Sequence, residues 1–148
     1  MPEWIAAGFN EYAKRMPREM PLKLIELKPE ARRDTPGTGA AVRVLEKEAQ
    51  RIETAMPKDA VMVVLDESGK SVTTKQLAQR LTQWREGGRD VAFVIGGADG
   101  TAAHLKSSAH WLWSLSPLTL PHGLVRVILA EQLYRAVSIL NNHPYHRV

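Results

Sequence analysis

The tail of the chain, "NNHPYHRV" from Asn141 to Val148, gathers side chains that can do chemistry. His146 titrates near neutrality, Tyr145 offers an aromatic face with a hydroxyl, and Arg147 is a fixed cation. Arg135 adds a second cation on the helix that precedes the tail. Such a set suits phosphate binding, base stacking and proton removal at one place. A solvated polar terminus remains the alternative.

Two histidines of the tail, His143 and His146, also raise the question of a metal. A zinc site needs three or four protein ligands, and the sequence shows no third ligand at a suitable spacing. We therefore predict no metal site.

The stretch "VIGGADG" places Gly96, Gly97 and Gly100 between an apolar strand and a helix. Open α/β sheets bind ligands at the carboxyl ends of their strands, and glycines let the backbone approach a ligand closely. The spacing differs from G-x-G-x-x-G and occurs late in the chain, so it matches a dinucleotide fingerprint poorly. The alternative is an ordinary tight turn.

The stretch "LSPLTLPHG" forms a second candidate loop, bounded by Pro117 and Pro121. The prolines stiffen it, and its alternating hydroxyls and apolar side chains can present backbone groups beside an apolar surface. This arrangement suits an adenine-like ring, although a plain connection into the next helix fits equally well.

Strands and helices are predicted to alternate along the chain, which indicates an α/β fold with a mostly parallel sheet and flanking helices. We expect a single domain over residues 1–148. The chain opens on a helix with no strand before it, so on this pattern we expect that a first strand is missing upstream of Met1. The first half is predicted to hold a helix from Pro2 to Met16, a strand from Leu22 to Leu27, a mobile loop "KPEARRDTPGTG", a helix around Leu45 to Met56, a strand from Ala60 to Asp66 and a turn "ESGK". A helix follows, capped by Thr73 or Thr74 and ended by Gly87 and Gly88, and then a buried strand "DVAFVIGG". The last predicted elements are a weaker helix from Thr101 to Trp111, a strand "LWSLS" and a long helix from Leu124 to Asn141.

The long helix carries apolar residues on more than one side. Such a helix is either central in its own fold or buried a second time against a partner, so a homodimer is plausible. Glu131 and Arg135 stand four residues apart on it, which predicts an intrahelical ion pair.

Composition narrows the class of protein. The chain has 148 residues, no cysteine and a formal charge of +4, with a pI of about 9.6. The absence of cysteine excludes disulfides and thiolate chemistry and is compatible with the cytoplasm. The start does not resemble a signal peptide, and no stretch is long and apolar enough to span a membrane. The positive charge favours a polyanionic partner without specifying one.

Three motifs taken together resemble the ribosomal RNA large subunit methyltransferase H family of the SPOUT class: "VIGGADG", "WSLSPLTLPHGLVRVILAEQLYRA" and "NHPYHR". The resemblance covers nearly the whole chain. It implies a small homodimeric cytoplasmic enzyme with a C-terminal trefoil knot, the SPOUT-type α/β knot. It also implies methylation of ring nitrogen 3 of a pseudouridine in large-subunit (23S) ribosomal RNA on assembled ribosomes, with S-adenosylmethionine as the cofactor and no DNA or membrane partner.

The resemblance also implies site residues. The cofactor contacts would fall on Leu65, Gly97, Ser116, Pro117, Leu118, Thr119, Leu120 and Pro121. The RNA-side residues would be Arg135, Tyr145, His146 and Arg147, with His122 and Glu131 as nearby candidates.

The chain departs from the family pattern at two places. Ala98 and Asp99 stand where the family often has proline and glutamate, which keeps the glycines and a carboxylate. Family members also usually begin about ten residues earlier, with an apolar strand.

Two other functions stay open on the residues alone. A non-enzymatic module could bind the ribosome through its basic surface, and a nucleotide-binding oxidoreductase could use the doubly wound fold. The first would not bind S-adenosylmethionine, and the second would bind a nicotinamide cofactor.

Overall fold

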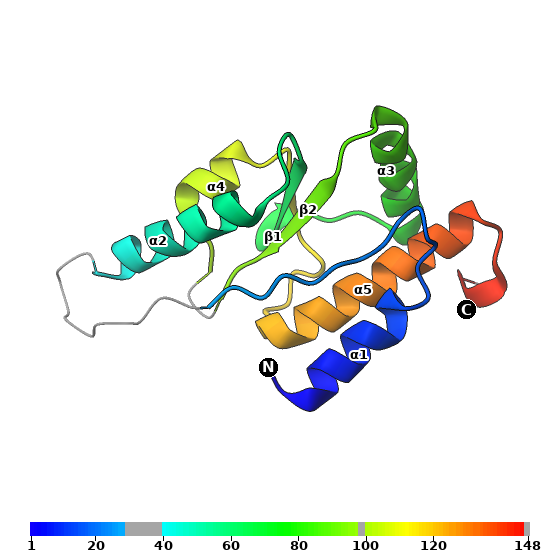
Figure 1. The fold of residues 1–148 in the computed structure, drawn as a ribbon, viewed down its shortest axis with the longest axis horizontal. Helices are drawn as coiled ribbons and strands as arrows, with labels where there is room; N and C mark the ends of the chain where they lie inside the picture. The colour runs from blue at the N-terminus through cyan, green and yellow to red at the C-terminus, as the bar shows by residue number, and fades with distance from the viewer. Residues whose placement is uncertain (29–39, 98–99, 147–148) are drawn as a thin grey trace.

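The computed structural model describes residues 1–28, 40–97 and 100–146 (Figure 1), and for residues 40, 41 and 146 it describes the backbone alone. Helices and strands alternate as predicted. In chain order, the elements are α1 (Glu3–Ala13), α2 (Ala40–Ala55), β1 (Val61–Lys70), α3 (Thr74–Gly87), β2 (Val91–Ile95), α4 (Ala103–Ser108), β3 (Trp111–Trp113), α5 (His122–Leu140) and the short 3-10 helix η1 (Pro144–His146).

The three strands form a parallel sheet in the order β2-β1-β3. In the register of this sheet, Leu65 of β1 lies beside Ile95 of β2 and beside Trp113 of β3. The prediction of an α/β fold with a parallel sheet and flanking helices is therefore confirmed.

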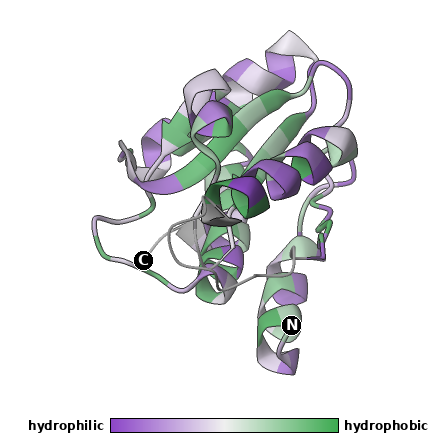
Figure 2. Cartoon of the chain, turned by 90° about the vertical axis from the view of Figure 1, so that its left-hand side faces the viewer, coloured by the Kyte–Doolittle hydropathy of each residue, from purple (hydrophilic) through white to green (hydrophobic). Residues whose placement is uncertain are grey.

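The central strand β1 is buried on both faces, as its apolar run from Val61 to Leu65 predicts. Alternate residues point to opposite sides of the sheet, so the strand contributes to two separate cores. Figure 2 shows apolar colour along the strands and polar colour on the outer turns of the helices. One core joins Val61, Val63 and Leu65 to α3, α5, Trp111 and Trp113, and the other joins Met62 and Val64 to Val94, α2 and α4.

Helix α3 begins and ends where its sequence predicts. Thr73 caps the helix: its hydroxyl accepts a hydrogen bond from the amide of Gln76, whose side chain accepts one from the amide of Thr73. Gly88 ends the helix in the left-handed region at φ 68°, which favours glycine.

Helix α5 lies between α1 on one side and the sheet with α3 on the other (Figure 1). Leu129, Leu133, Ala136 and Val137 are buried in the core shared with α3 and β1. On the side of α1, a Cβ added to Gly8 would lie 3.2 Å from the methyl groups of Val127, so the two helices approach closely. The apolar residues around α5 are thus explained by its central position within one chain.

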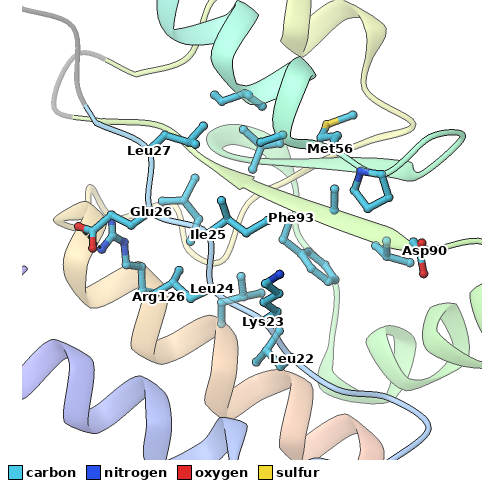
Figure 3. Close-up of a pocket in the computed structure, with 18 of the residues that line it drawn as sticks. Leu22, Lys23, Leu24, Ile25, Glu26, Leu27, Met56, Asp90, Phe93 and Arg126 are labelled. Carbon is cyan, nitrogen blue, oxygen red and sulfur yellow. Dashed lines mark hydrogen bonds and ion pairs between the residues drawn. The ribbon is translucent and has the colours of Figure 1, made fainter.

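The predicted strand from Leu22 to Leu27 is wrong, because this segment pairs with no strand of the described sheet. A cavity of about 820 Å³ lies between the segment and the free edge of β2 (Figure 3). A strand needs a neighbour that satisfies its backbone groups, and here the cavity separates the two. We call this cavity the β2 slot; it is lined by Leu22–Lys28, Val91–Ile95 and parts of α2 and α5.

The position of β2 at this free edge also corrects its predicted burial. Only Val94 of the strand is fully buried, and the other four residues are half-buried. The apolar sequence of β2 predicts a strand covered on both faces, but Phe93 and its neighbours line the β2 slot instead.

Several element boundaries differ from the predictions. The strand β1 continues to Lys70, but its pairing with β3 is interrupted between Leu65 and Lys70, so the predicted "ESGK" turn is present as a bulge inside the strand. The strand β3 is shorter than "LWSLS", and α4 is shorter than predicted. Most of the predicted mobile loop, residues 29–39, lies outside the described residues. No helix of the described chain is long and apolar enough to cross a membrane.

Candidate functional site

The carboxyl ends of the three parallel strands meet at one edge of the sheet. Leu65, Ile95 and Trp113 form one row across it, so the residues that follow them leave the sheet side by side. Gly97 comes two residues after Ile95, and Ser116 comes three residues after Trp113. The sheet register thus brings together the three segments expected to hold the cofactor, at the edge where open α/β sheets bind ligands.

The glycine loop after β2 folds tightly back on itself. The amide of Gly100 donates a hydrogen bond to the carbonyl of Gly97 over 3.0 Å, and Gly100 adopts φ 87°, where side chains are disfavoured. A Cβ on Gly96 would lie 2.7 Å from the carbonyl oxygen of Gly100, too close for any other residue without a shift of the backbone. Gly97, in contrast, is exposed and has room. Ala98 and Asp99 lie outside the described residues.

The proline loop from Ser116 to Pro121 is ordered by its own side chains. The Ser116 hydroxyl accepts a hydrogen bond from the amide of Leu118 over 3.0 Å, and Thr119 donates one to the Glu67 carboxylate over 2.8 Å. The second bond ties the loop to the bulge of β1. Leu118 remains 70% exposed, and Pro117, Thr119 and Pro121 are exposed as well, while Ser116 and Leu120 are half-buried.

The bulge of β1 packs closely against β3. A Cβ on Gly69 would lie 2.6 Å from the carbonyl oxygen of Leu112. Burial acts to raise the pKa of Asp66, but hydrogen bonds from Ser68 and the nearby Lys106 outweigh it, and the pKa is lowered. The Asp66 carboxylate lies 3.4 Å from the ammonium group of Lys106 in α4.

These three segments fit a ligand with an adenine-like ring. An exposed leucine and two prolines supply apolar surface, and the open backbone at Gly97 allows close approach. Serine, threonine and backbone groups of the same loop supply the few polar contacts that fix orientation.

The tail residues meet at the other end of α5. Glu131 and Arg135 form the predicted ion pair at 2.6 Å, and the hydrogen bond to Glu131 raises the pKa of Arg135. The Arg135 guanidinium lies over the Tyr145 ring, 4.8 Å from its centroid. Burial, a hydrogen bond with Tyr12 and the nearby Glu131 carboxylate raise the pKa of Tyr145 to about 12, so this phenol stays neutral near pH 7.

Of the four predicted RNA-side residues, the structure therefore brings Arg135 and Tyr145 together, with Glu131 beside them. His146 is described by its backbone at the end of η1, and Arg147 lies outside the described residues. His122 is exposed at the first turn of α5 and lines the β2 slot, so it lies at the end of the helix next to the proline loop rather than beside the tail.

Within one chain, the proline loop and the tail residues lie far apart. The proline loop ends at Pro121, where α5 begins, whereas Arg135 follows His122 by thirteen residues along the same helix. At the rise of an α-helix this separation is about 20 Å. The proline loop and the pair of Arg135 and Tyr145 thus lie toward opposite ends of α5.

The sequence reasoning missed some participants. Tyr12 and Tyr134 contact Tyr145 of the tail, Arg15 lies over the rings of Tyr12 and Tyr134, and Glu67 anchors the proline loop. The helical spacing of Tyr12 with Phe9 and Met16 marks it as inward-facing, but spacing does not reveal which residues it meets.

The comparison with known families decides the class of protein. A family model described as "Predicted SPOUT methyltransferase" matches residues 1–146. The chain belongs to the SPOUT methyltransferase family. Similar curated members of this kind include "Ribosomal RNA large subunit methyltransferase H" of Burkholderia mallei (strain SAVP1) and the protein of the same name of Burkholderia pseudomallei (strain K96243). Each is 62% identical over 147 residues, which cover 99% of this chain and 92% of the relative.

Proposed function

We propose that this SPOUT methyltransferase transfers a methyl group from S-adenosylmethionine to ring nitrogen 3 of a pseudouridine in large-subunit ribosomal RNA, on assembled ribosomes. The observation that carries the proposal is the meeting of the β1 end, the glycine loop and the proline loop at one edge of the sheet. The similarity to curated relatives named for large-subunit ribosomal RNA methylation supports the choice of substrate.

The cofactor half of the site is assigned to Leu65, Gly97 and the loop from Ser116 to Pro121. When bound there, S-adenosylmethionine supplies a methyl group that is already strongly electrophilic. The chain therefore has mainly to orient the two reactants and to help the ring nitrogen lose its proton. Hydrogen bonds of Ser116 and Thr119 hold the proline loop in shape. The close approach of the Gly100 backbone to Gly96 keeps the glycine loop tight.

The RNA half of the site is assigned to the tail. Arg135 and Arg147 bind RNA phosphate or a carbonyl oxygen of the base. Tyr145 orders the base and acts as a neutral phenol. Its raised pKa keeps it protonated near pH 7, so it has no phenolate form there that could take up a proton. His146 is the candidate for removing the proton, on the basis of an ordinary imidazole pKa of about 6.5.

We further propose that the active form is a homodimer in which the tail of one subunit completes the cofactor half of the other. The separation of about 20 Å along α5 supports this arrangement, because proton removal and methyl transfer act on the same nitrogen and need their groups in contact. The basic charge of the chain adds attraction for ribosomal RNA.

The first experiment measures transfer of labelled methyl from S-adenosylmethionine to ribosomes that lack the modification. Label in large-subunit RNA at ring nitrogen 3 of pseudouridine would support the proposal, and its absence both with this chain and with the extended chain of the second arm would overturn it. A second arm uses a chain extended upstream by an apolar strand, since the β2 slot offers such a strand a free edge to pair with. Label only with the extended chain would show that catalysis needs that strand.

Equilibrium dialysis with S-adenosylmethionine tests the cofactor half separately. Thr119→Val removes the bond to Glu67 and is expected to weaken cofactor binding about three- to tenfold, as for the loss of one ordinary hydrogen bond. Thr54→Val is the matched control, because its hydroxyl bonds only within α2, to the carbonyl of Gln50. Ribosome binding without any cofactor binding would instead favour a non-enzymatic module.

A further inference from the structure

The three tyrosines of the chain gather in one cluster beside the tail, although they come from three elements. Tyr12 belongs to α1, Tyr134 to α5 and Tyr145 to η1. The ring centroids of Tyr12 and Tyr145 are 6.3 Å apart in an edge-to-face arrangement, and those of Tyr134 and Tyr145 are 4.7 Å apart. Aromatic pairs at these separations attract each other beyond the burial of their surface.

The hydroxyl of Tyr145 is also held. Interaction with the Tyr12 side chain acts to raise the pKa of Tyr145, and interaction with Tyr145 acts to raise the pKa of Arg135. The Arg135 guanidinium also lies over the Tyr145 ring, 4.8 Å from its centroid. The phenol is thus held at its hydroxyl as well as at its ring.

Tyr12 contacts neighbours at the end of α1. The guanidinium of Arg15, just beyond the helix, lies 5.4 Å from the centroid of the Tyr12 ring and 5.8 Å from that of Tyr134. Glu11 of α1 pairs with Arg15. Because α1 packs against α5, these groups hold Tyr12 beside the end of α5.

The backbone of the tail shows why a side-chain contact matters here. The chain reverses after α5 at Asn142, which adopts φ 53°, and the amide of His143 returns to the carbonyl of Ser138 over 2.8 Å. Beyond this point the amide of Tyr145 bonds locally, donating to the His143 ring over 3.2 Å. The ring and hydroxyl of Tyr145 thus supply its link to α1.

We propose that Tyr12 is a positioning residue of the RNA half of the site, which holds Tyr145, and with it the catalytic tail, through the hydroxyl contact and the edge of its ring. This inference rests on the proposed function for its meaning. Tyr12 itself contacts neither RNA nor cofactor in this scheme and acts through Tyr145.

The test combines a spectroscopic and a kinetic measurement on the full chain. Tyrosine labelled at the ζ carbon gives three nuclear magnetic resonance signals, and Tyr145→Phe identifies the one from Tyr145. Tyr12→Phe keeps the ring and removes the hydroxyl, so the Tyr145 signal is expected to move at neutral pH. Tyr134→Phe is the matched control, because it removes a neighbouring hydroxyl that has no part in the proposed link, and it should leave the signal nearly in place.

In the methyl-transfer assay, Tyr12→Phe is expected to lower kcat about three- to tenfold, with little change in the KM for S-adenosylmethionine. Combined with Tyr145→Phe, it should cause no further loss, because the two variants break the same contact. Tyr12→Ala, which also removes the ring, should be more harmful than Tyr12→Phe.

The outcomes separate this inference from the proposed function. An unmoved Tyr145 signal in Tyr12→Phe, or losses that multiply in the double variant, would overturn the positioning role. A moved signal together with non-additive losses would support it. If the unsubstituted chain transfers no methyl group, the proposed function fails and the catalytic role fails with it, while the signal still decides whether Tyr12 docks the tail.

Discussion

Gly96 shows how one residue sets the shape of the cofactor half. It ends the straight part of β2 and lies where the loop doubles back, so that a methyl group there would collide with the backbone of Gly100. The collision is with the Thr101 hydroxyl and also with the main chain of Gly100, so the loop has to move to relieve it. Small size at this position is therefore a requirement of the loop itself.

Gly96→Ala is accordingly expected to weaken binding of S-adenosylmethionine by about tenfold or more, since forced overpacking costs roughly 1–3 kcal/mol. Titration calorimetry checks it. The matched control is Gly87→Ala, because a Cβ there meets nothing within 4 Å and alanine favours the helix in which Gly87 lies. Equal cofactor affinity in Gly96→Ala and the unsubstituted chain would contradict the assignment of the loop.

Arg135 can be tested as a phosphate contact through salt. If Arg135 binds a phosphate, Arg135→Ala should weaken ribosomal RNA binding and lower the slope of log affinity against log salt by about one. Arg89→Ala removes the same charge at the amino end of the sheet, where Arg89 donates to the carbonyl of Asp59, and should leave the slope nearly unchanged. A weakened affinity with an unchanged slope would mean that Arg135 reads a neutral group such as a base carbonyl.

Residue-level prediction from the sequence works for local contacts and fails for distant ones. The pair of Glu131 and Arg135 follows from a spacing of one helical turn, and the structure confirms it. The contact between Tyr12 and Tyr145 joins residues near the two ends of the chain. No periodicity encodes that distance, so only the folded arrangement of α1 against α5 reveals it.

At the scale of elements, β1 and the segment from Leu22 to Leu27 make an instructive pair. Both have apolar sequences typical of strands, yet only β1 is one. The difference is that β1 has a neighbour on each side, whereas the segment faces the β2 slot. The composition of a segment predicts its tendency to be extended, but hydrogen-bond partners decide whether it becomes a strand.

Helices α2 and α4 are joined by His104, which the sequence analysis did not single out. Its two ring nitrogens lie 2.9 Å from carboxylate oxygens of Glu46 and Glu53, and hydrogen bonds to these groups raise the pKa of His104. A raised pKa in the folded state means that the protonated form is stabilised. Its contribution is complete below the unfolded pKa of about 6.5 and is lost as the pH rises through the folded value.

His104→Ala should therefore lower the free energy of unfolding more at about pH 6 than at about pH 9, where less of the unsubstituted imidazole is protonated. Urea denaturation at both pH values measures the difference. The double variant Glu46→Gln with Glu53→Gln removes the carboxylates and should abolish this difference between the two pH values. A destabilisation by His104→Ala that is the same at both would assign His104 a packing role only.

At the scale of the whole molecule, the separation of the two half-sites determines what mixing of subunits will do. A cofactor-half variant such as Gly96→Ala and a tail variant such as Arg135→Ala are expected to be weakly active alone. If sites are shared across a dimer, half of the randomly mixed dimers contain one intact site of two, so activity returns to about a quarter of the unsubstituted level. Recovery should require subunit exchange, and mixtures that stay inactive after exchange would place each complete site within one chain.

The central position of β1 has a further consequence for how the protein opens. Val63 and Val64 are fully buried and pair with strands on both sides, so their amide hydrogens are shielded until the sheet comes apart. The strand β2 has a free edge beside the slot, and its outward amides can meet solvent through smaller fluctuations. Deuterium uptake along β1 would thus report the stability of the whole domain, while uptake along β2 would report how often its edge loosens.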